Sequence, residues 1–344
     1  MTATERRHSH SLKALLQEDD LAVSKMAPAD ILDTVLHALP SFTAFHACHT
    51  TSYRQLTAAV RPAVEALFSS ESGAPRSFGP FGLLSFPYRT MGKIDSLDLF
   101  GLDELIIFAF YWTNRQRYHR VLDFGANIGL HSVLMARCGF DVKAYEPDPD
   151  TYAILCKNLE LNDCRTVRTV QAAVAAHSGT RDFVRVLGNR TGSHLAGAKL
   201  NPYGALETIS VRTVAFRDAL STADLIKMDV EGVEAEVIAS TERADWDRTD
   251  MLLEIGSEAN AISIFETLSS MQVNIFAQRQ SWSRVRDIDA MPKSYKDGIV
   301  FISRKSAMPW PHQTEQLSGA ALTKQALRTK TQGPDGAHSV RKPS

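Results

Sequence analysis

The sequence predicts an α/β protein with a parallel sheet and an added N-terminal helical region. From residue 120 onward, short β-rich runs alternate with helical stretches, which is typical of strands joined by helices that cover a parallel sheet. The first of these runs leads directly into a glycine-containing turn and a helix. Residues 1–70 carry no such alternation and instead show apolar stripes with a helical period of 3.6 residues.

The N-terminal region, residues 1–95, is predicted to contain helices followed by a connector. One apolar stripe includes Ile31, Val35 and Leu39, and a second includes Val60 and Val64. Between residues 72 and 92, glycine and proline are too frequent for a helix or a strand, which indicates a connector. We therefore expect the main domain to span residues 96–304.

The main domain opens with an apolar helix over about residues 97–112 that contains Asp103 and Glu104. Seven strands are then predicted, at Arg120–Phe124, Asp141–Tyr145, Val167–Ala172, Asp224–Met228, Asp250–Ile255, Val273–Ala277 and Gly298–Ser303. Two further β-like runs, Phe183–Leu187 and Thr208–Val214, flank a long polar stretch from Gly188 to Gly204. Loops of that length are usually functional or disordered. Residues 305–344 are predicted to form a disordered basic tail.

Composition and charge exclude several classes of protein. The chain has 344 residues, and 38 basic against 39 acidic residues leave a net charge of −1. This balance provides no general field for nucleic acid. The longest apolar run, Leu105–Trp112, is far shorter than the roughly 20 residues of a membrane span. The polar N-terminus does not resemble a secretory signal, and the four cysteines lack C-x-x-C spacing. We expect a soluble, cytoplasmic protein.

The most informative segment is the run Asp-Phe-Gly-Ala-Asn-Ile-Gly at residues 123–129. Two glycines, Gly125 and Gly129, allow a tight turn and a close approach of the backbone to a ligand, and the following helix offers free amides. A dinucleotide site with the pattern G-x-G-x-x-G would need glycine at the third and sixth positions, where Asn127 and Leu130 stand. Asp123 repels phosphate but suits a ligand with an amino group and a sulfonium. The turn, including Ala126, therefore favours S-adenosylmethionine over NAD.

Two further cofactor contacts are predicted at the ends of neighbouring strands. Glu146, which precedes Pro147, ends the second strand, where a carboxylate can accept hydrogen bonds from two ribose hydroxyls. This feature alone does not separate S-adenosylmethionine from NAD. Small residues around Ala173, at the end of the next strand, would admit an adenine ring.

These motifs resemble those of the FkbM-type S-adenosylmethionine-dependent methyltransferases. The resemblance rests on residues 123–132, on Tyr145–Pro149, on the run Ile-Lys-Met-Asp-Val-Glu-Gly-Val-Glu at residues 226–234, and on Leu252–Ile255. It implies a class I methyltransferase (Rossmann-like) fold, with a seven-stranded, mostly parallel sheet and an antiparallel strand near its end. It also implies methylation of a hydroxyl of a sugar, glycan or small secondary metabolite. The first 95 residues and the tail have no counterpart in the family.

An alcohol needs a general base near the transferred methyl group, and an open α/β sheet presents such groups at the carboxyl ends of its strands. Asp229 and Glu254 end the fourth and fifth strands, so Asp229 is our first candidate, with Glu254 and Glu231 next. Lys227 shares a side of its strand with Asp229 and can pair with it. His194, in the long loop, is a further candidate if that loop closes over the substrate. No metal is expected.

Two other functions remain open from the sequence alone. One is an NAD-dependent oxidoreductase on a similar fold, and the other is a binding module that has kept the fold without catalysis. The N-terminal helices would cover the cofactor crevice or form an interface between two copies of the chain. The acceptor itself cannot be identified from the sequence, because loops determine the shape of its pocket.

Overall fold

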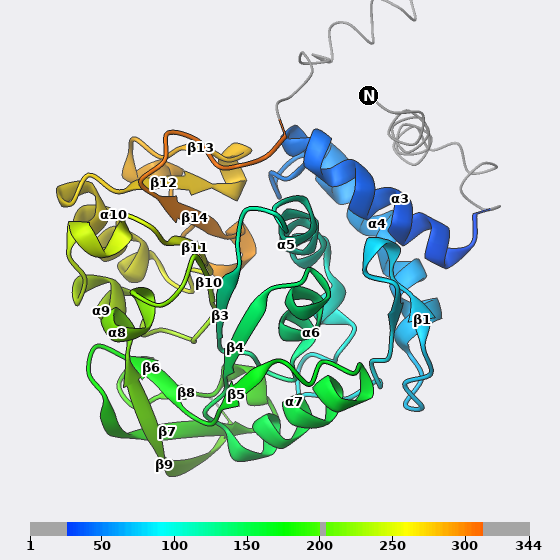
Figure 1. Cartoon of the computed structure of the whole chain (residues 1–344), viewed down its shortest axis with the longest axis horizontal. Helices are drawn as coiled ribbons and strands as arrows, with labels where there is room; N and C mark the ends of the chain where they lie inside the picture. The colour runs from blue at the N-terminus through cyan, green and yellow to red at the C-terminus, as the bar shows by residue number, and fades with distance from the viewer. Residues whose placement is uncertain (1–25, 200–203, 312–344) are drawn as a thin grey trace, which may run out of the picture. The chain divides into compact units, whose positions relative to one another are not determined.

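The computed structural model describes residues 26–199 and 204–311. Its main sheet contains β3 (Arg120–Phe124), β4 (Asp141–Tyr145), β5 (Arg168–Val170), β10 (Leu225–Met228), β11 (Asp250–Leu253), β12 (Asn274–Ala277), β13 (Ser283–Arg284) and β14 (Val300–Ser303). Their order in the sheet is β13-β12-β14-β11-β10-β3-β4-β5 (Figure 1). The neighbours from β5 to β11 are parallel, whereas β14 is antiparallel to both β11 and β12.

All seven predicted strands of this sheet are present, but the predicted count of seven is wrong by one. The eighth strand, β13, pairs with β12 through only two residues, Ser283 and Arg284. A two-residue strand is too short to show a period in the sequence, and it directly follows a turn in which Ser281 and Trp282 have positive φ. The antiparallel strand expected near the end of the sheet is β14.

Helices cover both faces of the sheet (Figure 1). One face carries α5 (Leu102–Thr113), α6 (Leu130–Arg137) and α7 (Pro149–Leu161), and the other carries α8 (Phe216–Leu220), α9 (Glu234–Ala239) and α10 (Glu258–Ser270). Successive strand residues alternate between the two cores: Val121 packs with the first helix group, and Leu122 packs with the second. The strands are apolar on both sides because both sides are buried.

The N-terminal region packs against the first of these cores. It contains α3 (Pro28–Ala38), α4 (Thr51–Phe68) and a small hairpin of β1 (Arg76–Ser77) and β2 (Leu83–Leu84). Phe78 is fully buried, with its ring centroid 5.8 Å from Phe68, 5.5 Å from Phe100 and 6.1 Å from Phe108 of α5. The predicted helices are therefore confirmed for residues 28–38 and 51–68, while residues 1–25 lie outside the described part. The domain boundary at residue 95 stays a prediction.

A second sheet stands beside the main one, in the order β6-β9-β7-β8. Its strands are β6 (Ala173–Ala175), β7 (Gly179–Leu187), β8 (His194–Leu195) and β9 (Ala205–Ala215). The two β-like runs are thus confirmed as β7 and β9. The expectation of one long loop from Gly188 to Gly204 is wrong in part, because β8 pairs with β7 in its middle. Residues 200–203 lie outside the described part.

Short 3₁₀ helices complete the described chain, at Leu39–Ser41, Thr43–Phe45, Gly79–Phe81, Asp98–Phe100, Arg190–Gly192, Arg243–Trp246, Gln278–Gln280, Ile288–Ala290 and Tyr295–Asp297. Among the described residues, no helix combines the length and the apolar character needed to cross a bilayer. Most of the predicted disordered tail, residues 312–344, lies outside the described part.

Truncating the buried aromatic ring of Phe78 should destabilise the whole folded unit. We expect Phe78→Ala to lower the free energy of unfolding by about 3–5 kcal/mol in a single urea transition followed by tryptophan fluorescence. The control is Leu83→Ala, because Leu83 is 62% exposed, and its cost should stay below about 0.5 kcal/mol. An early, separate transition in the Phe78 variant would mean that the N-terminal helices unfold independently of the sheet.

Candidate functional site

The glycine turn between β3 and α6 brings two strand ends into direct contact. Gly125 has a φ of +73°, and a Cβ atom placed on it would lie 1.7 Å from the carbonyl oxygen of Asp229. Only glycine therefore allows the end of β3 to approach the end of β10 this closely. Asn127 also has a left-handed backbone, with a φ of +51°. Its amide N donates a hydrogen bond to Glu146 Oε2 over 3.0 Å.

Glu146 connects this turn to the end of β4. It is 7% exposed, and its second oxygen, Oε1, accepts a hydrogen bond from the amide of Asp148 over 2.9 Å. Burial raises the pKa of Glu146 to about 8, although the two backbone amides and Lys227 act in the opposite direction. The amide of Glu146 bonds to the carbonyl of Val170, so the short segment with Ala172 and Ala173 lies next along the same edge of the sheet.

Asp123 and Lys227 form the buried charged centre of the site. Asp123 is 0% exposed, and its Oδ2 accepts a hydrogen bond from Ser132 Oγ over 2.6 Å. Its Oδ1 has no hydrogen-bond partner among the described residues and lies 3.7 Å from Lys227 Nζ. Lys227 Nζ also donates to the carbonyl of Gly125 over 3.2 Å and lies 3.8 Å from Asp229 Oδ2. The predicted pairing of Lys227 with Asp229 is thus present.

Burial alone would lower the pKa of Lys227, but the carboxylates around it outweigh burial. Asp123 and Asp229, followed by Glu104 and Glu254, raise this pKa above its usual value. The ammonium is therefore charged at neutral pH. It holds the ends of β3 and β10 together through three contacts at once.

A pocket of about 160 Å³ opens next to this centre, at the carboxyl ends of β10 and β11. Its lining includes five carboxyl groups and one ammonium, those of Asp98, Asp103, Glu104, Asp229, Glu254 and Lys227. Burial raises the pKa of Glu254 well above its usual range, with further contributions from Asp229 and Glu104. Asp229 has 37% of its side chain exposed. A pocket with this excess of carboxyl groups suits a ligand that carries positive charge.

Glu104 is a member of this pocket that the sequence analysis did not assign to the site. It lies on α5, and its Oε2 is 2.9 Å from Nε2 of His131 on α6, whose Nδ1 is 3.0 Å from the hydroxyl of Tyr111. Burial acts to raise the pKa of Glu104, but His131 and Lys227 outweigh it, so the pKa is lowered. The sequence did contain a sign of this role, because Asp103 and Glu104 open an otherwise apolar helix.

Two other predicted catalytic residues lie away from this pocket. Glu231 Oε2 is 2.5 Å from Lys199 Nζ, and burial together with Asp229 raises the pKa of Glu231 to about 7. His194 is 1% exposed on β8, where its Nδ1 is 2.9 Å from the carbonyl oxygen of Gly192, and burial lowers its pKa. Neither side chain lines the 160 Å³ pocket. Their catalytic roles stay predictions.

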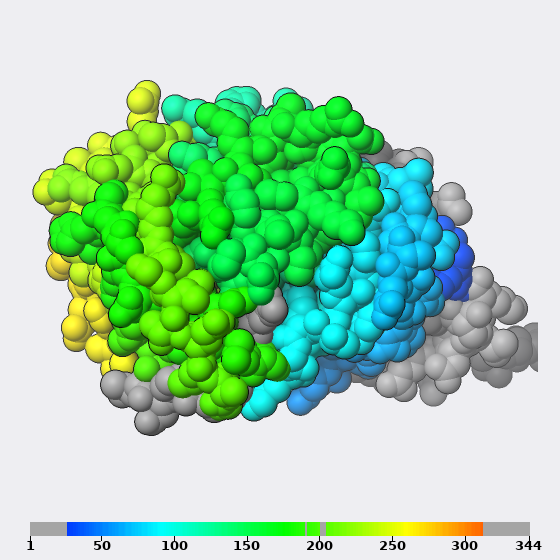
Figure 2. Space-filling model, turned by 90° about the horizontal axis from the view of Figure 1, so that it is seen from below, coloured from blue at the N-terminus to red at the C-terminus, as the bar shows by residue number. Residues whose placement is uncertain are grey.

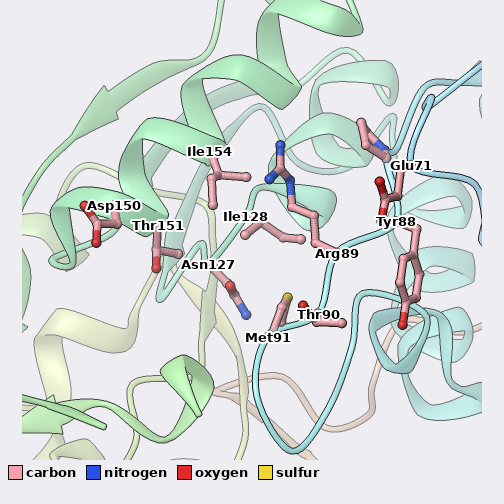
Figure 3. Close-up of a pocket in the computed structure, with 11 residues that line it drawn as sticks. Glu71, Tyr88, Arg89, Thr90, Met91, Asn127, Ile128, Asp150, Thr151 and Ile154 are labelled. Carbon is pink, nitrogen blue, oxygen red and sulfur yellow. The ribbon is translucent and has the colours of Figure 1, made fainter. Parts of the chain in front are cut away.

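A larger pocket, of about 620 Å³, lies beside the glycine turn (Figure 3). Residues 87–91 form one wall, Asn127 and Ile128 of the turn form another, and Asp150, Thr151 and Ile154 of α7 form a third. From the sequence, residues 72–92 are expected only to form a connector. No pattern in that segment indicates a pocket, because the pocket exists only where the connector meets the turn and α7.

Comparison with known proteins finds matches over the main domain. Residues 123–287 match the family model described as the methyltransferase FkbM domain. The methyltransferase sdnD of Sordaria araneosa is 29% identical over 160 residues, which is 37% of this chain and 62% of that protein. The hexuronic acid methyltransferase AglP of Haloferax volcanii is 26% identical over 154 residues, which is 44% of this chain and 62% of that protein. The chain thus matches less than two thirds of the length of each relative.

Solved structures provide a more distant likeness. An O-methyltransferase from Bacillus cereus, solved in complex with SAH, is 12% identical, with a TM-score of 0.32. The match covers 58% of this chain and 80% of that protein.

A methyl group at Gly125 should force the ends of β3 and β10 apart. We expect Gly125→Ala to reduce the free energy of unfolding by about 3 kcal/mol or more, because a clash with a backbone carbonyl adds to the left-handed strain. The control is Gly139→Ala, which has a φ of +84° but no atom within 4 Å of the new Cβ. The control should cost only about 1–2 kcal/mol. Equal losses in urea unfolding of the two variants would contradict the proposed contact.

Proposed function

We propose that this chain, whose residues 123–287 belong to the FkbM methyltransferase domain family, is an S-adenosylmethionine-dependent methyltransferase that methylates a hydroxyl group. The family match carries the enzyme class and the methyl donor. The observation that carries the reacting centre is the charged pocket at the ends of β10 and β11, next to the glycine turn. The strand order and the antiparallel strand β14, which lies between β11 and β12, support the class I methyltransferase fold that the sequence implies.

The residues around the glycine turn fit this donor. S-adenosylmethionine supplies a methyl group attached to a positively charged sulfur. The excess of carboxyl groups around Lys227 balances such a charge. Oδ1 of buried Asp123, which accepts no hydrogen bond within the described residues, can accept one from an amino group. Glu146 is assigned to the ribose hydroxyls. The remaining proposed contacts are Gly125, Ala126, Asn127 and Gly129 of the turn, with Pro147 and Ala173 at the adenine.

Asp229 is the proposed general base. It directly follows β10, its side chain is partly exposed in the pocket, and Lys227 Nζ lies 3.8 Å from its Oδ2, which limits the directions the carboxylate can take. Burial raises the pKa of Glu254, which favours the protonated form of this carboxyl, and a protonated carboxyl can donate a hydrogen bond to the acceptor. Glu254 is therefore the second candidate, followed by Glu231 and His194.

The proposed acceptor is a sugar, a glycan or a small secondary metabolite. The relative AglP, named for a hexuronic acid, supports a sugar-type acceptor. The alternative of an NAD-dependent oxidoreductase is not favoured, because Asn127 replaces the glycine that a pyrophosphate would need, and the family match is to a methyltransferase domain. The absence of a nucleic-acid partner, the cytoplasmic location and an interface formed by the N-terminal helices stay predictions.

Removing the Asp229 carboxylate should affect turnover much more than donor binding. We expect Asp229→Ala to reduce methyl transfer by about 10²-fold or more, the usual contribution of a general base, with affinity for S-adenosylhomocysteine changed less than about threefold. Calorimetry measures the affinity, and transfer of a labelled methyl group to a panel of sugars and hydroxylated metabolites measures turnover.

The matched control for that experiment is Asp289→Ala, because the Asp289 side chain is 85% exposed on the 3₁₀ helix Ile288–Ala290 and does not line the pocket. The control should keep full turnover. If Asp229→Ala also keeps it, the base is Glu254 or His194. If the unmodified protein binds S-adenosylhomocysteine but methylates no acceptor of the panel, it is a non-catalytic binding module.

Donor binding should strengthen as the pH rises through the pKa of Glu146. Because this carboxyl is protonated below a pH of about 8 in the free protein, its ionised form must be generated before it can accept two ribose hydroxyls. Calorimetric titration with S-adenosylhomocysteine should show proton release on binding at pH 7. Glu146→Gln should weaken binding and remove the proton release, whereas Glu160→Gln, at an exposed position on α7, should change neither.

The same raised pKa has a consequence for stability. A carboxyl whose pKa is higher in the folded than in the unfolded state contributes stability that is lost as the pH rises from its usual range to about 8. The difference in unfolding free energy between the wild type and Glu146→Gln should therefore become less favourable to the wild type over that range. A difference independent of pH would contradict the assigned pKa.

A further inference from the structure

The 620 Å³ pocket has walls suited to a small hydroxylated ligand. Pro87, Met91, Ile128 and Ile154 provide apolar surface. The polar groups of its lining include Tyr88, Thr90, Asn127 and Thr151. Pockets for small molecules commonly combine apolar walls with a few fixed polar groups in this way.

Arg89 is the feature of this pocket that indicates its ligand. Figure 3 shows its side chain extending from the 87–91 loop toward Ile154 of α7. Its Nε is buried and has no hydrogen-bond partner in the described chain, and no ion pair of its guanidinium is found there either. A buried Nε–H without an acceptor has lost water without gaining a hydrogen bond, which is unfavourable until an anion or another acceptor arrives.

Arg185, by contrast, has carboxylate partners for all three nitrogens of its guanidinium. Its Nε is 2.6 Å from Asp148 Oδ2, and its two terminal nitrogens are 2.5 Å from Asp150 and 2.7 Å from Glu207. The Asp150 carboxylate at the edge of the pocket therefore already has a cationic partner. Arg89 is left as the cation whose charge faces the pocket.

Two hydrogen bonds to Ser96 hold the backbone of Arg89 in place. The amide of Arg89 donates to Ser96 Oγ over 3.0 Å, and the Ser96 amide donates to the carbonyl of Arg89 over 2.9 Å. Farther along the loop, a Cβ atom on Gly92 would lie 1.9 Å from the carbonyl of Gly188, so the loop lies directly against the end of β7. The same two segments lie side by side in the space-filling view (Figure 2). The guanidinium is thus presented on a supported backbone.

We propose that Arg89 binds a carboxylate of the methyl acceptor in this pocket, so that the acceptor is a hydroxylated monocarboxylic acid such as a sugar acid. This inference rests on the proposed methyltransferase function. A guanidinium matches a carboxylate with two parallel hydrogen bonds. The pocket lining carries two acidic side chains, Glu71 and Asp150, beside the single cation Arg89. Asp150 is already paired with Arg185, and the single guanidinium of Arg89 offers partners for one carboxylate group.

The 620 Å³ pocket adjoins the proposed donor site at the ribose. Its lining does not include the side chains that we assign to the amino-acid end of the donor. Asn127 lines the pocket, and its amide holds Glu146, the residue assigned to the ribose. Asp123, assigned to the donor's amino group, contacts instead Lys227, which lines the smaller pocket. Arg89 therefore lies on the side of the proposed ribose contact, and an acceptor anchored there would have to extend past the turn for its hydroxyl to reach Asp229.

The test is calorimetric titration of the protein saturated with S-adenosylhomocysteine. D-glucuronate and D-galacturonate are each compared with the corresponding neutral hexose, which differs only at the carboxylate. At least one uronate should bind about tenfold or more tightly than its neutral partner. Arg89→Met should remove this preference, and Arg89→Lys should keep part of it, because an ammonium keeps the charge but not the paired geometry.

The matched control is Lys93→Met, which removes a positive charge from an exposed position of the same loop and should leave the preference unchanged. Equal binding of uronate and hexose, no uronate binding, or an unchanged preference in Arg89→Met would overturn the inference. Weakened S-adenosylhomocysteine binding in Arg89→Met would also overturn it, by assigning the guanidinium to the donor. If the unmodified protein does not bind S-adenosylhomocysteine, the proposed function itself fails.

Discussion

The close contact between the ends of β3 and β10 determines the geometry of the whole site. Gly125 meets the carbonyl of Asp229 with no room for a side chain, and Lys227 bonds to the carbonyl of Gly125 from the neighbouring strand. Through the amide of Asn127, the same turn also positions Glu146 at the end of β4. Three strand ends are therefore held together by one backbone contact and by hydrogen bonds between side chains and backbone, which keep their carboxylates at fixed positions.

The charges around this contact are unbalanced, and the imbalance explains the electrostatics of the site. One buried ammonium, Lys227, faces Asp123, Asp229, Glu104 and Glu254. Burial of several carboxyl groups beside one cation is unfavourable, and part of that cost appears as the raised pKa of Glu254. His131 compensates at Glu104. An excess of carboxyl groups of this kind fits a cationic methyl donor. Arg89, which lies apart from them, fits an anionic group on the proposed methyl acceptor.

The sequence predicted those parts of the site that depend on local order along the chain. Residues 123–129 begin at the end of β3, and Glu146 and Asp229 directly follow β4 and β10, so alternation and strand order place them at one edge of a parallel sheet. Glu104 was not predicted as a site residue because its contact with His131 joins two helices. Likewise Arg89 acquires its role only where the connector lies against the turn and α7. The position of His194 on a paired strand, β8, depends on β7 in the same way.

The sequence by itself determined the α/β class, the strands of the main sheet, and the motifs by which the chain resembles the FkbM methyltransferases. The spacing of apolar residues and the residues that form turns are local features of a few positions. They can therefore be interpreted without knowing the fold. The tertiary structure decided which charges meet, how far each is buried and where the pockets open. Those properties arise from packing between segments as distant as Arg89, Asn127 and Ile154, and no local pattern encodes them.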